Sequence, residues 1–97
     1  MGFTNDEVAQ RWAQGLKGKG SNMYTDGTTI YSYGEHFPIA TRNKGIILFN
    51  DDKYSVTTRK HQSIVGRYCN GEVYLCTTDE VRQAVQNPNL PVILTRM

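Results

Sequence analysis

Four residues of this 97-residue chain have side chains that can bind a metal ion or act in nucleophilic catalysis: His36, His61, Cys69 and Cys76. Their spacing matches neither the close cysteine pairs nor the close histidine pairs of structural zinc sites. His61 precedes Cys69 by eight residues, which is about 12 Å along a helix and too far for a cysteine–histidine catalytic pair. We therefore expect no metal ion, no cofactor and no enzymatic activity, and we expect His61 to be a packed core histidine.

Basic residues and tyrosines form a second set of candidates. The chain has a net charge of +2, yet the segment from Lys53 to Gly71 carries four basic residues and no acidic one. A basic surface with aromatic rings nearby is typical of proteins that bind single-stranded nucleic acid. The candidate binding residues are Lys17, Lys19, Tyr31, Tyr33, His36, Arg42, Lys44, Arg59, Lys60 and Arg67.

An ordinary structural explanation covers the same residues. Solvated basic faces are common, and tyrosines on strands usually pack against their neighbours. The isoelectric point of about 8.6 also lies below the value of about 9 that is typical of nucleic-acid-binding domains. DNA or RNA binding is therefore an alternative hypothesis and not the leading one.

The size and composition of the chain predict one domain over residues 1–97. No apolar run approaches the roughly 18 residues that a membrane span requires, so we expect no membrane contact. The N-terminus lacks the basic and then apolar pattern of a signal peptide. With two cysteines only, we expect reduced thiols and a cytoplasmic location.

The elements that must position these residues begin with a helix over about residues 5–15. Thr4 and Glu7 match the capping-box pattern at its start, and Trp12 lies on its apolar face, where we expect it in the core. The glycine- and lysine-rich segment 17–21 is predicted to be a solvated loop.

Short apolar segments separated by turn residues then predict an antiparallel β-meander of about five strands. Asp26 and Gly27 suit a two-residue turn, and Pro38 indicates a sheet edge or a bulge because it has no N–H group to donate. We expect Tyr54 and Val56 to face inward on the fifth strand. The five predicted strands cover residues 22–25, 28–33, 36–41, 45–49 and 53–56.

A helix–strand–helix–strand segment follows the meander. The first helix is predicted to be capped by Thr57 or Thr58 and to end near Tyr68, with one basic and one apolar face. Strands over residues 72–76 and 90–95, with a helix between them, suggest a parallel pair. The expected fold class is therefore α+β.

The central motif is similar to one found in a family of small proteins of phages, prophages and other mobile elements. The motif consists of two segments, Ile30–Ala40 with the sequence IYSYGEHFPIA, and Tyr54–His61 with the sequence YSVTTRKH. A third match is the helical pair Val8-Ala9 followed by Trp12. The resemblance covers roughly the first two-thirds of the chain. It implies an origin in a mobile element and carries over no catalytic residue.

Together these points lead to one hypothesis about function. We expect a non-enzymatic accessory protein that acts in the host cytoplasm by binding a host protein or nucleoprotein complex. Such a partner would include components of antiviral defence or of nucleic-acid handling. An exposed sheet edge would also allow self-association into a homo-oligomer.

Overall fold

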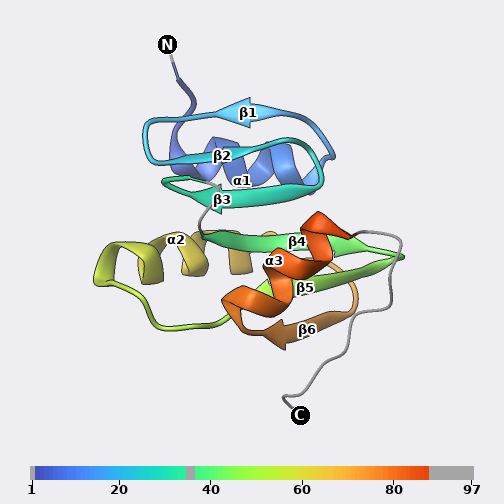
Figure 1. Cartoon of the computed structure of the whole chain (residues 1–97). Helices are drawn as coiled ribbons and strands as arrows, with labels where there is room; N and C mark the ends of the chain where they lie inside the picture. The colour runs from blue at the N-terminus through green and yellow to red at the C-terminus, as the bar shows by residue number, and fades with distance from the viewer. Residues whose placement is uncertain (1, 35–36, 88–97) are drawn as a thin grey trace.

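The computed structural model describes residues 2–34 and 37–87. Within these residues the chain forms three helices and six strands, which confirms the α+β class (Figure 1). The elements in chain order are α1 (Asn5–Ala13), β1 (Gly18–Lys19), β2 (Met23–Thr25), β3 (Thr29–Ser32), β4 (Pro38–Asn43), β5 (Ile46–Asn50), α2 (Val56–Gly66), β6 (Val73–Cys76) and α3 (Thr78–Gln86).

The six strands make one sheet in which spatial order follows chain order, from β1 to β6. The first five strands pair antiparallel, and β6 pairs parallel with β5. A parallel neighbour needs a crossover, and α2 supplies it between β5 and β6. The strand predicted over residues 90–95, with the parallel pair that it would form, lies outside the described residues.

Helices cover both faces of this sheet. Figure 1 shows α1 and α2 behind the sheet and α3 in front of it. The main core lies on the α1 and α2 side and consists of Val8, Ala9, Trp12, Met23, Ile30, Phe37, Ile39, Ala40, Ile47 and Val65. A smaller cluster, here called the α3 core, consists of Leu48, Cys76, Val81 and Ala84.

The N-terminal helix has the predicted cap. Thr4 Oγ1 accepts from the N–H group of Glu7 at 3.1 Å, and Glu7 Oε1 accepts from the N–H group of Thr4 at 2.9 Å. Trp12 is fully buried, as expected, and its indole Nε1–H donates to the carbonyl oxygen of Thr28 at 2.8 Å. The helix ends at Ala13, two residues before the predicted end.

Two assignments at the ends of the predicted meander are wrong. Residues 53–56 are not a strand, because Ser55 caps α2 by accepting from the N–H group of Thr58, and Val56 is already helical. Tyr54 and Val56 are each 77% exposed and do not face inward. Conversely, the segment expected to be a loop contains β1, whose Gly18 and Lys19 pair with β2.

The prediction for Pro38 is half right. Pro38 begins β4, which lies between β3 and β5 and is not an edge strand. The β3–β4 register shifts between Ile30 and Tyr31, beside the position opposite Pro38, so the bulge is present. In the described part of the sheet, the edges are β1 and β6.

Two turns differ in detail from the predictions. Asp26 pairs with Thr29, so the central residues of the β2–β3 turn are Gly27 and Thr28 and not Asp26 and Gly27. The β4–β5 turn is shorter than the predicted segment 42–44, because β4 continues to Asn43. Lys44 and Gly45 make this turn with φ values of 51° and 86°.

Candidate aromatic binding pocket

A cavity of about 560 Å³ opens at the end of the sheet where β3 and β5 finish. Figure 1 shows that α2 and α3 both begin at this end. Its volume lies within the usual range for ligand pockets, roughly 300–1,000 Å³. We call this cavity the aromatic pocket; its lining residues are Ser32, Tyr33, Gly34, Phe37, Tyr54, Thr58, Thr78, Asp79 and Arg82.

Three aromatic rings line the pocket. Phe37 is nearly buried, with 6% of its surface exposed, whereas Tyr33 and Tyr54 are 60% and 77% exposed. The rings of Phe37 and Tyr54 are in contact, with centroids 5.5 Å apart and planes inclined by 42°. The pocket therefore combines a packed aromatic ring with two tyrosines that solvent, or a partner, can reach.

Tyr33 has an uncommon backbone conformation. Its φ is 66°, in the left-handed region that non-glycine residues seldom occupy. The N–H group of Tyr33 donates to the carbonyl oxygen of Asn22 at 2.7 Å, and its ring contacts the His61 ring at a centroid distance of 5.3 Å. Strained residues of this kind concentrate at functional sites. Here the left-handed conformation and the hydrogen bond to Asn22 place an exposed tyrosine at the pocket wall.

Beneath Tyr33, His61 and Ser32 form a buried hydrogen bond. Ser32 Oγ and His61 Nδ1 are 2.7 Å apart, and the two residues are 3% and 2% exposed. Burial lowers the pKa of His61 from its ordinary value of 6.5 because the charged imidazolium is poorly solvated there. The expectation that His61 is a packed core histidine is confirmed.

A serine and a histidine at this distance also resemble a nucleophile and its base. Acyl transfer requires in addition N–H groups that are free to bind a developing oxyanion. In the described part of the β3–β4 connection these groups are already bonded: Tyr33 donates to Asn22, Gly34 to Ser32, and Phe37 to Gly34. The arrangement therefore positions the pocket wall and offers no oxyanion site there.

A set of polar side chains, here called the polar hub, joins α2 and α3 to the end of β5. Asn50 is fully buried; its Nδ2 donates to Pro38 O and to Thr78 Oγ1, each at 2.9 Å. Gln62 Nε2 donates to the carbonyl oxygens of Asn50 and Asp52 at 2.7 and 3.0 Å. The polar hub consists of Asn50, Asp52, Gln62 and Thr78, and it fixes the α3 side of the pocket against the α2 side.

Acidic groups surround the first turn of α3. Asp52 Oδ2 accepts from the N–H group of Thr78 at 2.6 Å, and Glu80 completes a capping box with Thr77. At the pocket rim, Asp79 Oδ1 lies 3.2 Å from Arg82 Nη1, and the Asp79 side chain is 82% exposed. Of these acidic residues, Asp79 lines the aromatic pocket, where it is paired with Arg82.

Most of the predicted basic residues do not gather into one surface. Lys17 and Lys19 are exposed at the β1 edge, and Lys44 is exposed in the β4–β5 turn. Arg42 stacks 5.0 Å above the Trp12 ring and also donates to the carbonyl oxygen of Gly27. Arg67 lies 3.6 Å from Asp6 on α1.

The remaining predicted site residues also divide. Tyr33 lines the aromatic pocket, whereas Tyr31 is 8% exposed and stacks on Tyr24 at a centroid distance of 4.7 Å. Arg59 and Lys60 are exposed on α2. His36 lies outside the described residues. Of the strand tyrosines suggested for base stacking, Tyr31 is therefore a packing residue.

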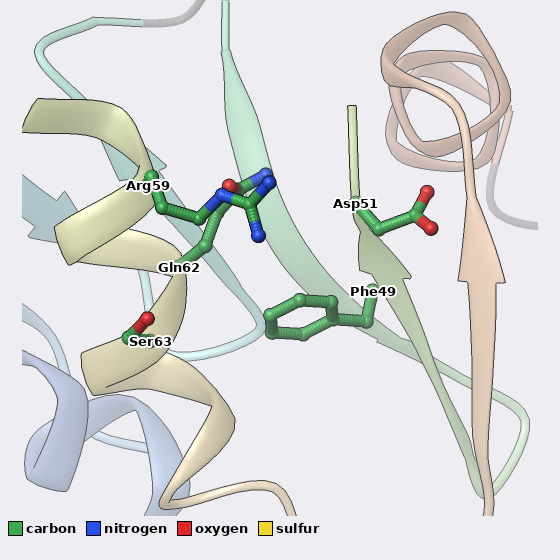
Figure 2. Close-up of a pocket in the computed structure, with 5 residues that line it drawn as sticks. All are labelled: Phe49, Asp51, Arg59, Gln62 and Ser63. Carbon is green, nitrogen blue, oxygen red and sulfur yellow. The ribbon is translucent and has the colours of Figure 1, made fainter. Parts of the chain in front are cut away.

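A second, smaller cavity of about 210 Å³ lies between α2 and β5 (Figure 2). Figure 2 shows Arg59 and Gln62 extending from α2 toward β5, and the Phe49 ring extending from β5 toward α2. The carboxylate of Asp51 points away from Arg59. Gln62 already donates to the carbonyl oxygens of Asn50 and Asp52 within the polar hub, so we assign this cavity to the packing between α2 and the sheet.

The two thiols are poor candidates for chemistry. Burial raises the pKa of the Cys69 thiol to about 11, so the reactive thiolate is scarce near neutral pH. Cys76 is fully buried in the α3 core. Over residues 2–34 and 37–87, no three histidine, cysteine or acidic side chains are grouped as a metal ion would require. No helix in that part of the chain is long and apolar enough to cross a membrane.

Sequence reasoning missed most of this pocket. Tyr54 is predicted to face inward on a strand, and neither Asp79 nor Arg82 is among the candidate binding residues. The available signal was the central motif itself, because its two segments supply Ser32, Tyr33, Phe37, Tyr54 and Thr58 to the lining. Comparison with protein-family models, curated proteins and solved structures finds no match for this chain.

Proposed function

We propose that this protein is a non-enzymatic binding module that captures a partner protein through the aromatic pocket. The observation that carries the proposal is the convergence of both motif segments and the start of α3 on one cavity. Tyrosine and arginine dominate the binding energy of many protein interfaces, and Tyr33, Tyr54 and Arg82 line this cavity. A strained tyrosine at its wall is consistent with a binding role.

The nature of the partner rests on the resemblance of the motif to small proteins of phages and mobile elements. The proposed partner is a host protein, in the cytoplasm of the host cell, and the proposed effect is to occupy that protein and block it. Defence complexes and nucleic-acid-handling complexes are the classes that this role would suit.

Direct DNA or RNA binding is the alternative, and the geometry does not favour it. Arg42 and Arg67 are engaged within the protein, Tyr31 is buried, and the exposed lysines lie on separate elements. A nucleic-acid binder should shift oligonucleotides in a gel at low salt and lose them steeply as salt rises. We expect no such shift.

Affinity capture tests the proposal. The purified chain should retain a stoichiometric partner from a host lysate, and a Tyr33→Ala/Tyr54→Ala variant should lose it. A matched Lys17→Ala/Lys19→Ala variant, altered at the exposed β1 edge, should retain it. Capture that survives loss of both tyrosines would show that the partner binds elsewhere, and repeated failure to retain any protein would refute the proposal.

A further inference from the structure

We infer that the aromatic pocket takes an arginine side chain of the partner protein, held between the tyrosine rings and the carboxylate of Asp79. The inference rests on the proposed function and specifies which group of the partner enters the cavity. It follows from the chemistry of the lining residues, in three steps.

The first step is the aromatic wall. The face of an aromatic ring is electron-rich and attracts cations, and arginine is the cation most often found there. Tyr33 and Tyr54 are both exposed enough to be covered by a ligand, and Phe37 closes the wall behind Tyr54. A planar guanidinium can stack on such rings, whereas a lysine ammonium acts as a point charge.

The second step is the charge at the rim. A helix N-terminus ordinarily favours anions through its unbonded N–H groups. At the start of α3, Thr78 N–H donates to Asp52 and Glu80 N–H donates to Thr77 Oγ1. With these N–H groups bonded, the charged groups that the pocket lining presents are the exposed carboxylate of Asp79 and the guanidinium of Arg82 beside it. An incoming cation can pair with that carboxylate.

The third step is the availability of Asp79. Its side chain is 82% exposed, and its Oδ1 lies 3.2 Å from Nη1 of Arg82 on the same helix. Exposed ion pairs within a helix are weak. An incoming arginine can therefore form a two-bond pair with Asp79 while its plane covers a tyrosine ring, and this combination is stronger than the pair that it replaces.

Peptide binding followed by NMR tests the inference. The probes are three short capped peptides that differ at one position: arginine, citrulline, which is its neutral isostere, or lysine. The arginine peptide should shift the amide signals of Tyr33, Gly34, Tyr54 and Asp79 in the full chain. The citrulline peptide should bind about tenfold more weakly because it keeps the shape and loses the charge. The lysine peptide should fall between the two.

Matched variants locate the contact. Asp79→Asn should weaken the arginine peptide several-fold, whereas Glu72→Gln, which removes the same charge beside β6, should leave binding unchanged. Tyr54→Leu keeps an apolar side chain without an aromatic face and should also weaken binding. The amide spectrum of each variant shows whether it is folded.

Several results would overturn the inference. These are equal binding of the arginine and citrulline peptides, equal binding of the arginine and lysine peptides, shifts confined to another surface, or no shift at all. Failure here and failure of the proposed function are distinguishable. A partner captured through Tyr33 and Tyr54 but indifferent to Asp79→Asn would refute the arginine contact alone, whereas peptide binding without any captured protein would refute the proposed function alone.

Discussion

On the α1 side of the sheet, Trp12, Met23 and Ile30 are each at most 1% exposed. They belong to one hydrophobic cluster with residues from four strands, β2 to β5, and from the helices α1 and α2. On the α3 side, the cluster formed by described residues is smaller and includes Cys76 and Ala84, which bury little apolar area. What joins α3 to the rest of the molecule is in large part the polar hub around Asn50. The two sides of the sheet are thus held by different kinds of interaction.

This difference accounts for the position of the aromatic pocket. A cavity of this size inside a hydrophobic cluster would cost free energy, because the residues around it would lose packing contacts. Hydrogen bonds at the end of a strand fix elements at a set distance without filling the space between them. The polar hub fixes α3 against α2 and the end of β5, and the pocket lies beside it, between the starts of the two helices and the end of β3.

The largest expected effect is on the α1 side. Trp12→Ala should lower the free energy of unfolding by about 3–5 kcal/mol, because it removes a fully buried indole and its hydrogen bond to Thr28. Chemical denaturation followed by circular dichroism measures this loss. A loss below about 1 kcal/mol would mean that the main core does not depend on Trp12.

Breaking the polar hub should have the next largest effect. Asn50→Ala removes the donors to Pro38 and Thr78 and the acceptor for Asp52, and should cost about 3 kcal/mol. Unlike Trp12→Ala, it should also loosen α3 selectively. In Asn50→Ala, amide hydrogen exchange should therefore be accelerated, relative to the unsubstituted protein, more in α3 than in α1. Equal acceleration in both helices would contradict the distinction between the two sides.

The sequence predicted the α1 side well and the pocket side poorly, for a physical reason. Thr4, Glu7 and Trp12 act through local capping and helical periodicity, which a single segment reveals. Asn50 is a residue type that is typical of turns. In the structure it is buried, and its side chain donates hydrogen bonds to Pro38 on β4 and Thr78 on α3. Tyr54 lies in an alternating pattern that mimics a strand, and the Ser55 cap overrides it. Contacts between distant segments leave no periodic signal.

The third effect concerns pH. Burial lowers the pKa of His61 below 6.5, so in mildly acidic solution the unfolded chain takes up a proton that the folded chain does not. The stability that neutral His61 contributes is therefore fully present above about pH 6.5. It is lost as the pH falls from there toward the lowered pKa of His61 in the folded chain. The free energy of unfolding decreases in this range by at most about 1.4 kcal/mol per pH unit.

Comparison with a variant isolates this contribution. His61→Gln should be less stable at neutral pH because it disturbs the contact with Ser32, but its stability should fall less steeply between pH 6.5 and lower values. Denaturation midpoints across that range give both slopes. Identical slopes in the two proteins would show that His61 does not titrate differently in the folded and unfolded chains.

The smallest expected effect on stability is at the pocket itself. Tyr54 is 77% exposed, so Tyr54→Ala should change the free energy of unfolding by no more than about 0.5 kcal/mol. Tyr31, at 8% exposure and stacked on Tyr24, is the matched control, and Tyr31→Ala should cost several times more. Partner capture should show the reverse order, because Tyr54 faces the pocket and Tyr31 does not line it. If Tyr54→Ala destabilised the protein as much as Tyr31→Ala, its ring would belong to the core, and the division between packed and available tyrosines would be wrong.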